Sequence, residues 1–274
     1  WSINIGVRHI LPTYPFFICI AAAGAGIMIR KYYFLIYLLI VILLFHAFTA
    51  WRTAPNYIAF GNDLWGGTNN THNLLDNSNV DWGQNLKIVA QYIETENIND
   101  CWLASPGMGE LVRSYQPCHL MPAPGWTATE QVIEPLPPVI EGTVFLSSAV
   151  LPPQSTVFES ITKTPPITIL GGSIFVYQGR FEIPLASALS YVALGSRHIR
   201  FKQFDEAIAD GQKAIELAPN DPRTHLYMGN ALVMIGKSEP ARLEFERVLI
   251  LAQTNPDLYS FEQQQASHSL LNLR

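Results

Sequence analysis

Two apolar stretches stand almost back to back near the start of this 274-residue chain. The first runs from about Ile10 to Ile29 and the second from about Tyr32 to Trp51, and neither contains Asp, Glu, Lys or Arg. Each is about 20 residues long, the length that an α-helix needs to cross a hydrocarbon core of about 30 Å. A soluble core seldom needs two such runs, and a cleavable signal peptide has a single shorter run followed by a cleavage site. The pattern therefore predicts two membrane helices within residues 1–52.

Only Arg30 and Lys31 separate the two stretches, which predicts a tight helical hairpin. Basic residues favour the cytoplasmic side of a membrane, so we expect this turn in the cytoplasm. The chain after Trp51 would then be extracytoplasmic, in the periplasm of a bacterium. The residues that follow Trp1 are typical of the end of a loop, and we expect the chain to be the C-terminal part of a longer multi-pass membrane protein.

Charge and cysteine content limit the possible partners and sites. The formal net charge of −5 and the lack of any basic cluster argue against nucleic acid as the main partner. Cys19 lies in the first apolar stretch. Cys101 and Cys118 either form a disulfide, as in an extracytoplasmic compartment, or remain two half-buried thiols, and both interpretations stay open. No spacing of ligand-type residues predicts a metal site.

Short strands and helices alternate after residue 53. Asp81–Glu96 has helical spacing, with Leu86, Val89 and Ile93 on one face. The expected strands are Cys101–Ala104, Thr143–Val150 and Ile167–Tyr177, the last interrupted by Gly171 and Gly172, and the expected short helices are Glu110–Tyr115 and Val157–Thr162. This alternation predicts a small extracytoplasmic α/β domain over residues 53–182.

The last part of the chain, residues 183–274, has a helical repeat. Its period fits the 34-residue tetratricopeptide unit, with units at 188–221 and 222–255 and a closing helix at 256–271. The matching positions are Tyr191, Leu194, Gly195, Ala207, Ala214 and Pro219, followed by His225, Met228, Gly229, Ala241, Val248 and Gln253. Asp221-Pro222 and Asn255-Pro256 each predict an N-cap followed by proline in the first turn. Two units are fewer than the three that usually stand alone, so we expect them to lean on the α/β domain.

Three stretches together resemble a known family. They are residues 6–15 (GVRHILPTYP), residues 56–86 with the blocks NYIAFGN, GG and LDNSNVDWGQNL, and residues 171–181 with GGSIFVY and GRF. They resemble the C-terminal end of bacterial membrane glycosyltransferases of the GT-C fold that are related to the protein O-mannosyltransferases (glycosyltransferase family 39). Tetratricopeptide repeats follow the catalytic part in some members of that family.

The resemblance implies an activity whose catalytic residue lies elsewhere. Such enzymes take a sugar from a polyprenyl-phosphate carrier and pass it to an acceptor on the extracytoplasmic side. Their catalytic acidic residue lies in the first extracytoplasmic loop, so no general base can be assigned in this chain, and we expect the fragment alone to be inactive. The donor substrate is the lipid-linked sugar, and no separate cofactor is implied.

Arg8 and His9 are the candidates for binding the carrier phosphate. A guanidinium matches phosphate in a bidentate way, and an imidazole can add a hydrogen bond. The alternative is that both side chains anchor the first helix at the level of the lipid head groups.

Asp76, Asp81, Trp82 and Gln84 form a second candidate set. One interpretation is an edge that binds the sugar or the acceptor, with Trp82 stacked on a pyranose ring. The other is that Asp81 caps the helix 81–96, Asp76 fixes a loop and Trp82 is buried. We favour the second, because Asp before an amphipathic run is an ordinary helix start signal.

Two functional hypotheses follow from the sequence. The first is a membrane glycosyltransferase fragment whose repeats bind a protein or peptide on the concave face formed by their first helices. The second is a non-enzymatic, membrane-anchored tetratricopeptide adaptor. Further membrane segments and an acidic loop upstream would favour the enzyme, whereas a short soluble start would favour the adaptor.

Overall fold

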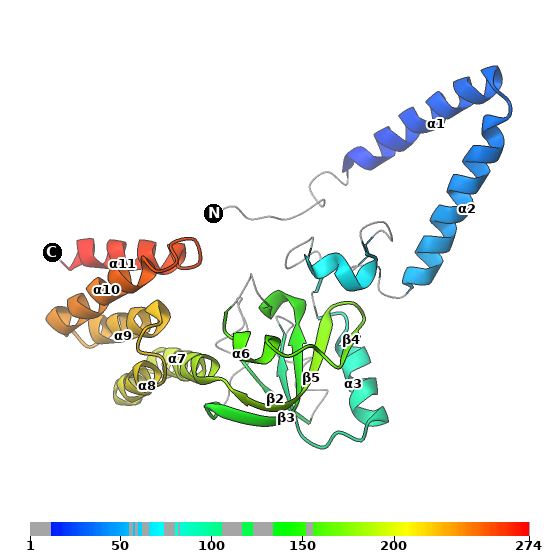
Figure 1. Ribbon diagram of the computed structural model, residues 1–274. Coiled ribbons are helices and arrows are strands. Elements are labelled where there is room, and N and C mark those ends of the chain that lie inside the picture. Colours follow the sequence, from blue (N-terminus) through cyan, green and yellow to red (C-terminus); the bar gives the residue numbers. More distant parts are fainter. Residues whose placement is uncertain are drawn as a thin grey trace.

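The computed structural model describes residues 12–54, 57, 60–61, 66–73, 80–81, 83–105, 117–122, 134–151 and 156–273. It contains two long N-terminal helices, a mixed five-stranded sheet with helices on both faces, and a C-terminal array of helices (Figure 1). The short helix expected at 110–115 lies outside the described residues.

The two apolar stretches form helices α1 (Tyr14–Lys31) and α2 (Leu35–Thr53). Both are long and apolar enough to cross a membrane, and only Thr49 and Thr53 among their described residues are buried. The prediction that Arg30 and Lys31 link the two helices is wrong. Both residues belong to the last turn of α1, and residues 32–34 make the connection. The expected tight hairpin is also wrong, because α1 and α2 diverge from this connection (Figure 1). The connection is made by bulky Tyr32, Tyr33 and Phe34.

The sheet has the strand order β2-β1-β3-β5-β4. Its strands are β1 (Cys101–Ala104), β2 (Cys118–Leu120), β3 (Val139–Ser147), β4 (Thr168–Leu170) and β5 (Ile174–Glu182). Strand β1 is parallel to β2 and β3, whereas β5 is antiparallel to β3 and β4. The expected strands at 101–104, 143–150 and 167–177 are therefore present. The strand expected at 167–177 is a hairpin of two strands, β4 and β5. The strand expected at 143–150 ends at Ser147, and residues 148–150 form a short 3-10 helix.

Helices cover both faces of the sheet. Along β3, Phe145 faces helix α3 (Leu86–Thr95), and its neighbours Val144 and Leu146 face the other side, which α6 (Glu159–Thr162) covers. This alternation is the period of two that a strand imposes on its side chains. The expected apolar face of α3 is confirmed, since Leu86, Val89 and Ile93 are all buried. The result is a three-layer α/β unit.

Cys101 and Cys118 form a disulfide. They are directly paired residues of the neighbouring parallel strands β1 and β2, and both are buried. The sequence left open a disulfide or two free thiols, and the structure has the disulfide. Cys19 remains a free, exposed thiol on α1.

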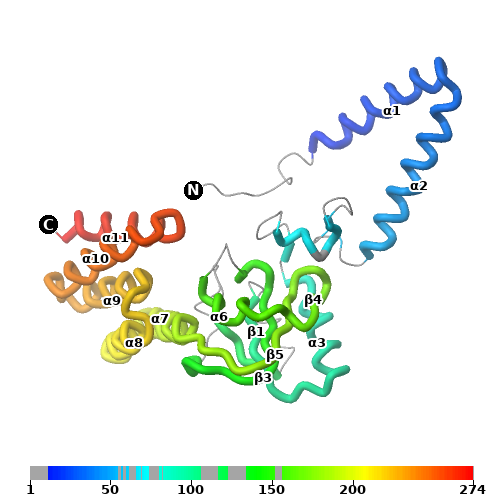
Figure 2. Tube along the Cα trace, viewed as in Figure 1, coloured from blue at the N-terminus to red at the C-terminus, as the bar shows by residue number. Residues whose placement is uncertain are grey.

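Five helices complete the chain: α7 (Pro184–Arg200), α8 (Phe204–Leu217), α9 (Pro222–Met234), α10 (Ser238–Ala252) and α11 (Ser260–Asn272). Successive helices pack side by side, as Figure 2 also shows. The repeated small residues Ala207, Ala214 and Ala241 are buried where the helices meet. The array is a tetratricopeptide-like pair of helical hairpins followed by a closing helix.

The two expected caps differ in outcome. Asp221 is the N-cap of α9, because its side chain accepts a hydrogen bond from the Arg223 amide and Pro222 occupies the first turn. Asn255 is not the cap of the closing helix, which begins only at Ser260. The Asn255 side chain instead accepts a hydrogen bond from the Leu258 amide, at 3.2 Å, and so stabilises a separate turn.

The repeats lean on the α/β unit through the first turns of α7. Ile183 and Ala186 belong to the same buried cluster as the sheet residues on the α6 side. The hydroxyl of Ser187 donates to the carbonyl of Leu136 at 2.6 Å, and the Leu136 amide donates to Ser190 Oγ at 2.9 Å. The domain boundaries at 52 and 182 stay predictions, although β5 ends at Glu182 and α7 begins at Pro184.

Candidate functional site

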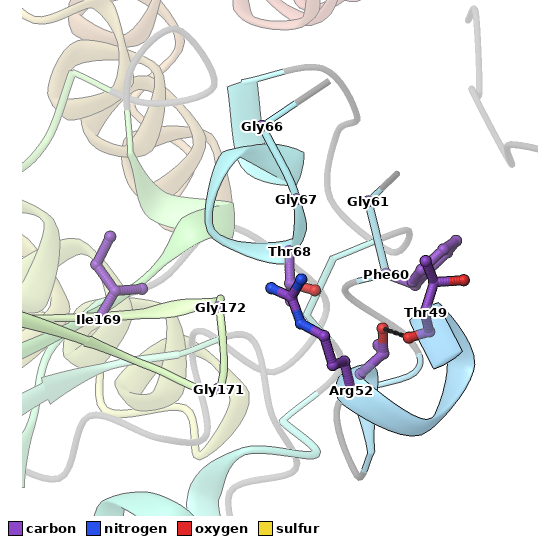
Figure 3. Close-up of a pocket in the computed structure, with 11 residues that line it drawn as sticks. Thr49, Arg52, Phe60, Gly61, Gly66, Gly67, Thr68, Ile169, Gly171 and Gly172 are labelled. Carbon is purple, nitrogen blue, oxygen red and sulfur yellow. Dashed lines mark hydrogen bonds between the residues drawn. The ribbon is translucent and has the colours of Figure 1, made fainter. Parts of the chain in front are cut away.

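A pocket of about 400 Å³ lies between the end of α2 and the α/β unit (Figure 3). The last turns of α2 contribute Thr49, Arg52 and Thr53 to its wall. Residues 60–61 and 66–68 and the β4–β5 hairpin supply the rest. Segments far apart in the sequence therefore meet at the point where the second apolar helix ends.

Among the described residues that line this pocket, Arg52 is the charged one. In Figure 3 its guanidinium extends from α2 toward Thr68. The two threonines beside it donate their hydroxyl groups to their own helix, Thr49 to the carbonyl of His46 at 2.9 Å and Thr53 to the carbonyl of Thr49 at 2.8 Å. The guanidinium of Arg52 itself lies 5.9 Å from the centre of the Phe48 ring, one turn earlier on α2.

Gly171 and Gly172 form the opposite wall as the two central residues of the β4–β5 turn. Both have positive φ, 57° and 73°, as a type I′ hairpin turn requires. The side-chain amide of Asn85 donates to the carbonyl of Gly171 at 3.0 Å and to Ser173 Oγ at 2.8 Å. A Cβ on Gly171 would come within 2.5 Å of Asn85, so the turn packs too closely for any larger residue.

Behind this turn lies a buried polar cluster around Asp81. Its carboxylate accepts hydrogen bonds from the Gly83 amide, at 2.9 Å, and from the hydroxyl of Ser147. Burial raises the pKa of Asp81, and the hydrogen bonds from Ser147, Gly83 and Ser173 oppose that rise. The cluster joins the chain before α3 to the end of β3 and so holds the pocket wall in place.

The favoured interpretation of Asp81 as a helix cap is wrong. Helix α3 begins at Leu86, and Asn85 occupies the N-cap position without a side-chain capping bond. Asp81 lies four residues before that position, and its oxygens are already used by Ser147 and Gly83. A tertiary partner, Ser147, takes the carboxylate that the sequence pattern assigned to the helix end.

The other residues singled out in the sequence fall into two groups. Arg8, His9, Asp76 and Trp82 lie outside the described residues, so their roles stay predictions. The amide of Gln84 donates to the carbonyl of Val80 at 2.8 Å, and neither Gln84 nor Asp81 is among the residues that line the pocket.

Sequence reasoning missed the residues that do line it. Arg52 directly follows the second apolar stretch, and the glycine pairs Gly66-Gly67 and Gly171-Gly172 stand inside the stretches that carry the family resemblance. The signal that could have indicated these pocket residues is a charged residue at the end of an apolar helix together with paired glycines. Among the described residues there is no group of three His, Cys, Asp or Glu side chains that could hold a metal ion.

A second concave feature lies on the repeats. A groove of about 420 Å³ runs across α7, α9 and α11, the first helix of each hairpin and the closing helix. Its apolar wall consists of Ile199, Val233, Met234 and Leu273, and its polar groups are Asn230, Ser269 and Asn272. None of these groove residues carries a charge.

No known protein family matches the chain, and no curated protein matches it. Among solved structures, the chain is similar to the TPR domain of Arabidopsis OM64, with 21% sequence identity and a TM-score of 0.27. The match covers 32% of this chain, and the chain spans 65% of that domain's length. The description of α7–α11 as tetratricopeptide-like repeats rests on their own packing and period.

Proposed function

We propose that this chain holds a protein or peptide on its helical repeats beside a membrane, as the C-terminal part of a GT-C-class membrane glycosyltransferase. The observation that carries the binding role is the uncharged groove across α7, α9 and α11. Its apolar side chains suit an apolar anchor of a partner, and the amides of Asn230 and Asn272 suit hydrogen bonds to a peptide backbone.

The membrane and compartment parts of the proposal have separate support. Helices α1 and α2 are apolar and exposed along nearly their whole described length, which suits a lipid environment. The Cys101–Cys118 disulfide suits an oxidising, extracytoplasmic compartment. The basic pair at the end of α1 suits a cytoplasmic connection.

The enzymatic part rests on the resemblance of residues 6–15, 56–86 and 171–181 to the mannosyltransferase-related family. In this proposal the donor is a sugar on a polyprenyl-phosphate carrier, and Arg8 and His9 bind the carrier phosphate. The general base comes from a loop outside this chain. The complete protein should therefore transfer sugar from a radiolabelled polyprenyl-phosphate hexose, and Arg8→Ala should abolish transfer while leaving membrane insertion intact.

The groove is tested in the same complete protein. Met234→Glu places a charge in the groove and should raise the KM for a polypeptide acceptor about tenfold without changing kcat. Leu243→Glu is the matched control, because Leu243 is 66% exposed on α10, away from the groove-lining residues. Equal KM values for the two variants would contradict an acceptor role for the groove.

The alternative is a non-enzymatic adaptor, which the same groove supports. A complete protein that consumes no lipid-linked sugar, yet binds a partner peptide in a way that Met234→Glu weakens and Leu243→Glu does not, would establish the adaptor.

A further inference from the structure

Helix α2 carries an imidazole, that of His46, near the middle of its length. Leu44 is the central one of the 19 residues of α2, and His46 follows two residues later. A helix rises about 1.5 Å per residue, so His46 lies about 3 Å from the midpoint. The Lys and Arg residues of the two apolar helices, which are Arg30, Lys31 and Arg52, all lie in a last turn. His46 is therefore the basic side chain at the depth of the bilayer interior.

An imidazole at this depth needs partners that lipid does not supply. A neutral imidazole has one hydrogen-bond donor and one acceptor, and a protonated one has two donors. A polar group that enters hydrocarbon without a hydrogen-bond partner raises the free energy of the system. Lysine and arginine reach the lipid head groups through long methylene stems, which an imidazole lacks. Histidines within membrane helices therefore face other protein segments or a water-filled cavity in almost all cases.

The structure shows which face of α2 turns toward the rest of the described chain. Thr49 and Thr53 are the buried residues of the two apolar helices. They follow His46 by three and seven residues, so the three side chains stand above one another on one side of the helix. We call this side, formed by His46, Thr49 and Thr53, the polar face of α2. His46 therefore lies on the side that α2 presents to the α/β unit.

The pocket of Figure 3 opens on the same face of the helix. Thr49 and Thr53 belong to its wall, and its volume is about 400 Å³. A water molecule occupies about 30 Å³ in the liquid, so the pocket has room for several. The hydroxyl of Thr49 donates to the carbonyl of His46, one turn further from the pocket along α2. The pocket and the imidazole thus occupy consecutive positions along one face of α2.

We propose that the polar face of α2 lines a water-filled cleft that leads from the pocket of Figure 3 into the membrane, with His46 at its inner end. Water is the occupant, because it offers both donors and acceptors to the imidazole and has room beside Thr49 and Thr53. The cleft gives a polar ligand from the soluble side a hydrogen-bonding position at the depth of the bilayer interior. The proposal does not depend on the function proposed above, since it concerns only how α2 lies in the membrane.

The test compares the reactivity of thiols at two positions of nearly the same depth. Membrane fragments with the complete protein, freed of other reactive thiols by changes that include Cys19→Ser, are treated with a water-soluble methanethiosulfonate. His46→Cys is the test variant and Leu44→Cys is its matched control, because Leu44 lies about 160° away around the helix. His46→Cys should react more than about tenfold faster than Leu44→Cys, because the reactive thiolate forms in water and not in hydrocarbon.

The unsubstituted protein gives a second measurement that does not depend on a variant folding correctly. Hydroxyl radicals generated in the water should oxidise His46 and spare Leu44, and mass spectrometry of the peptide that contains both residues reads the two sites together. A slow reaction of His46→Cys, equal to that of Leu44→Cys, would show that the polar face is dry and would overturn the proposal. An equally fast reaction of both variants would show water on every side of α2 and would overturn it as well.

Discussion

Single glycines set the spacing of the helical repeats. At Gly195 a Cβ would come within 1.9 Å of the Tyr227 hydroxyl, which itself donates to the carbonyl of Ala207 at 2.9 Å. At Gly229 a Cβ would come within 2.6 Å of the Phe245 ring. The equivalent positions of the two units thus have a similar reason for being glycine: an aromatic ring of another helix, Tyr227 of α9 or Phe245 of α10, occupies the place of the side chain.

Gly195→Ala should lower the free energy of unfolding of the repeats by about 1–3 kcal/mol, the usual cost of overpacking. Gly211→Ala is the milder comparison: a Cβ there would lie 3.0 Å from the flexible end of Met228 and 3.1 Å from the Tyr227 ring, so the change should stay within about 1 kcal/mol of the wild type. Thermal unfolding of the full chain in detergent, followed by circular dichroism, measures both. A Gly195→Ala variant as stable as Gly211→Ala would show that the helices can move apart without cost.

A buried histidine, His225, leads us to expect that the stability of the repeats depends on pH. His225 Nδ1 lies 2.7 Å from a carboxylate oxygen of Glu244, and Nε2 lies 2.9 Å from the carbonyl of Pro219. Both partners are acceptors, so both ring nitrogens donate only when the imidazole is protonated. Burial lowers the pKa of His225, but the bonds to Glu244 and Pro219 outweigh burial and the repulsion from Arg247, so the pKa lies above 6.5.

A raised pKa in the folded state means that protonation stabilises the fold. This contribution is fully present below pH 6.5, the ordinary value, and is lost as the pH rises through the higher folded value. The melting temperature of the wild type should therefore fall more steeply above about pH 6.5 than that of His225→Gln. His119→Gln, which changes an exposed histidine, should keep the steep fall; parallel curves for wild type and His225→Gln would contradict this reading.

At the scale of elements, the sheet depends on long-range pairing between short strands. Strand β3 pairs with β5 over its whole length, from Val139 with Glu182 to Ser147 with Ile174. Strand β2 has only three residues and pairs with β1, where the disulfide joins the two. Such a short edge strand has few hydrogen bonds, so the covalent link carries much of its attachment.

Replacement of Cys118 by Ser should lower the free energy of unfolding by about 2–4 kcal/mol, because the link closes a loop with a sequence separation of 17 residues. Cys19→Ser changes an exposed free thiol and should leave stability unchanged. Thiol counting under denaturing conditions should find one reactive group in the wild type and three after reduction. Three thiols before reduction would show that the bond does not form.

At the scale of the whole molecule, contacts between distant segments join the described parts of the chain. The first turns of α7 complete the core of the α/β unit, and the end of α2 meets the β4–β5 turn at the pocket of Figure 3. The α/β unit therefore stands close to the C-terminal end of the apolar helix α2. This arrangement suits a protein that works at a membrane surface.

Cysteine labelling tests the orientation of that assembly. In a Cys19→Ser background, Lys163→Cys places a thiol on the exposed end of α6 and Lys31→Cys places one at the end of α1. A membrane-impermeant maleimide should label Lys163→Cys in intact spheroplasts and Lys31→Cys only after permeabilisation, because basic residues favour the cytoplasmic side. The opposite pattern would place the soluble part in the cytoplasm.

Local pattern was enough to predict most of the elements, but not the three-residue strand β2 or the start of α11 at Ser260. The length and hydropathy of the two N-terminal stretches, the apolar face of α3 and the spacing of the repeats each follow from neighbouring residues. The Asp221 cap was predictable for the same reason, since its bond to the Arg223 amide spans two residues. Asn255 followed the same pattern, but the chain after it makes a separate turn first, and local sequence does not distinguish the two outcomes.

The sequence by itself therefore determined most of the helices and the strand regions at 101–104, 143–147 and 168–177, because short-range periodicity decides them. It did not predict the edge strand β2, whose three residues pair with distant β1. Only the tertiary structure decided that Asp81 bonds Ser147, that Cys101 faces Cys118, and that Arg52 and the Gly171-Gly172 turn share one pocket. Each of these depends on where distant segments meet, and in the pocket residues 52 and 171 meet only because the sheet brings its hairpin back to the end of α2.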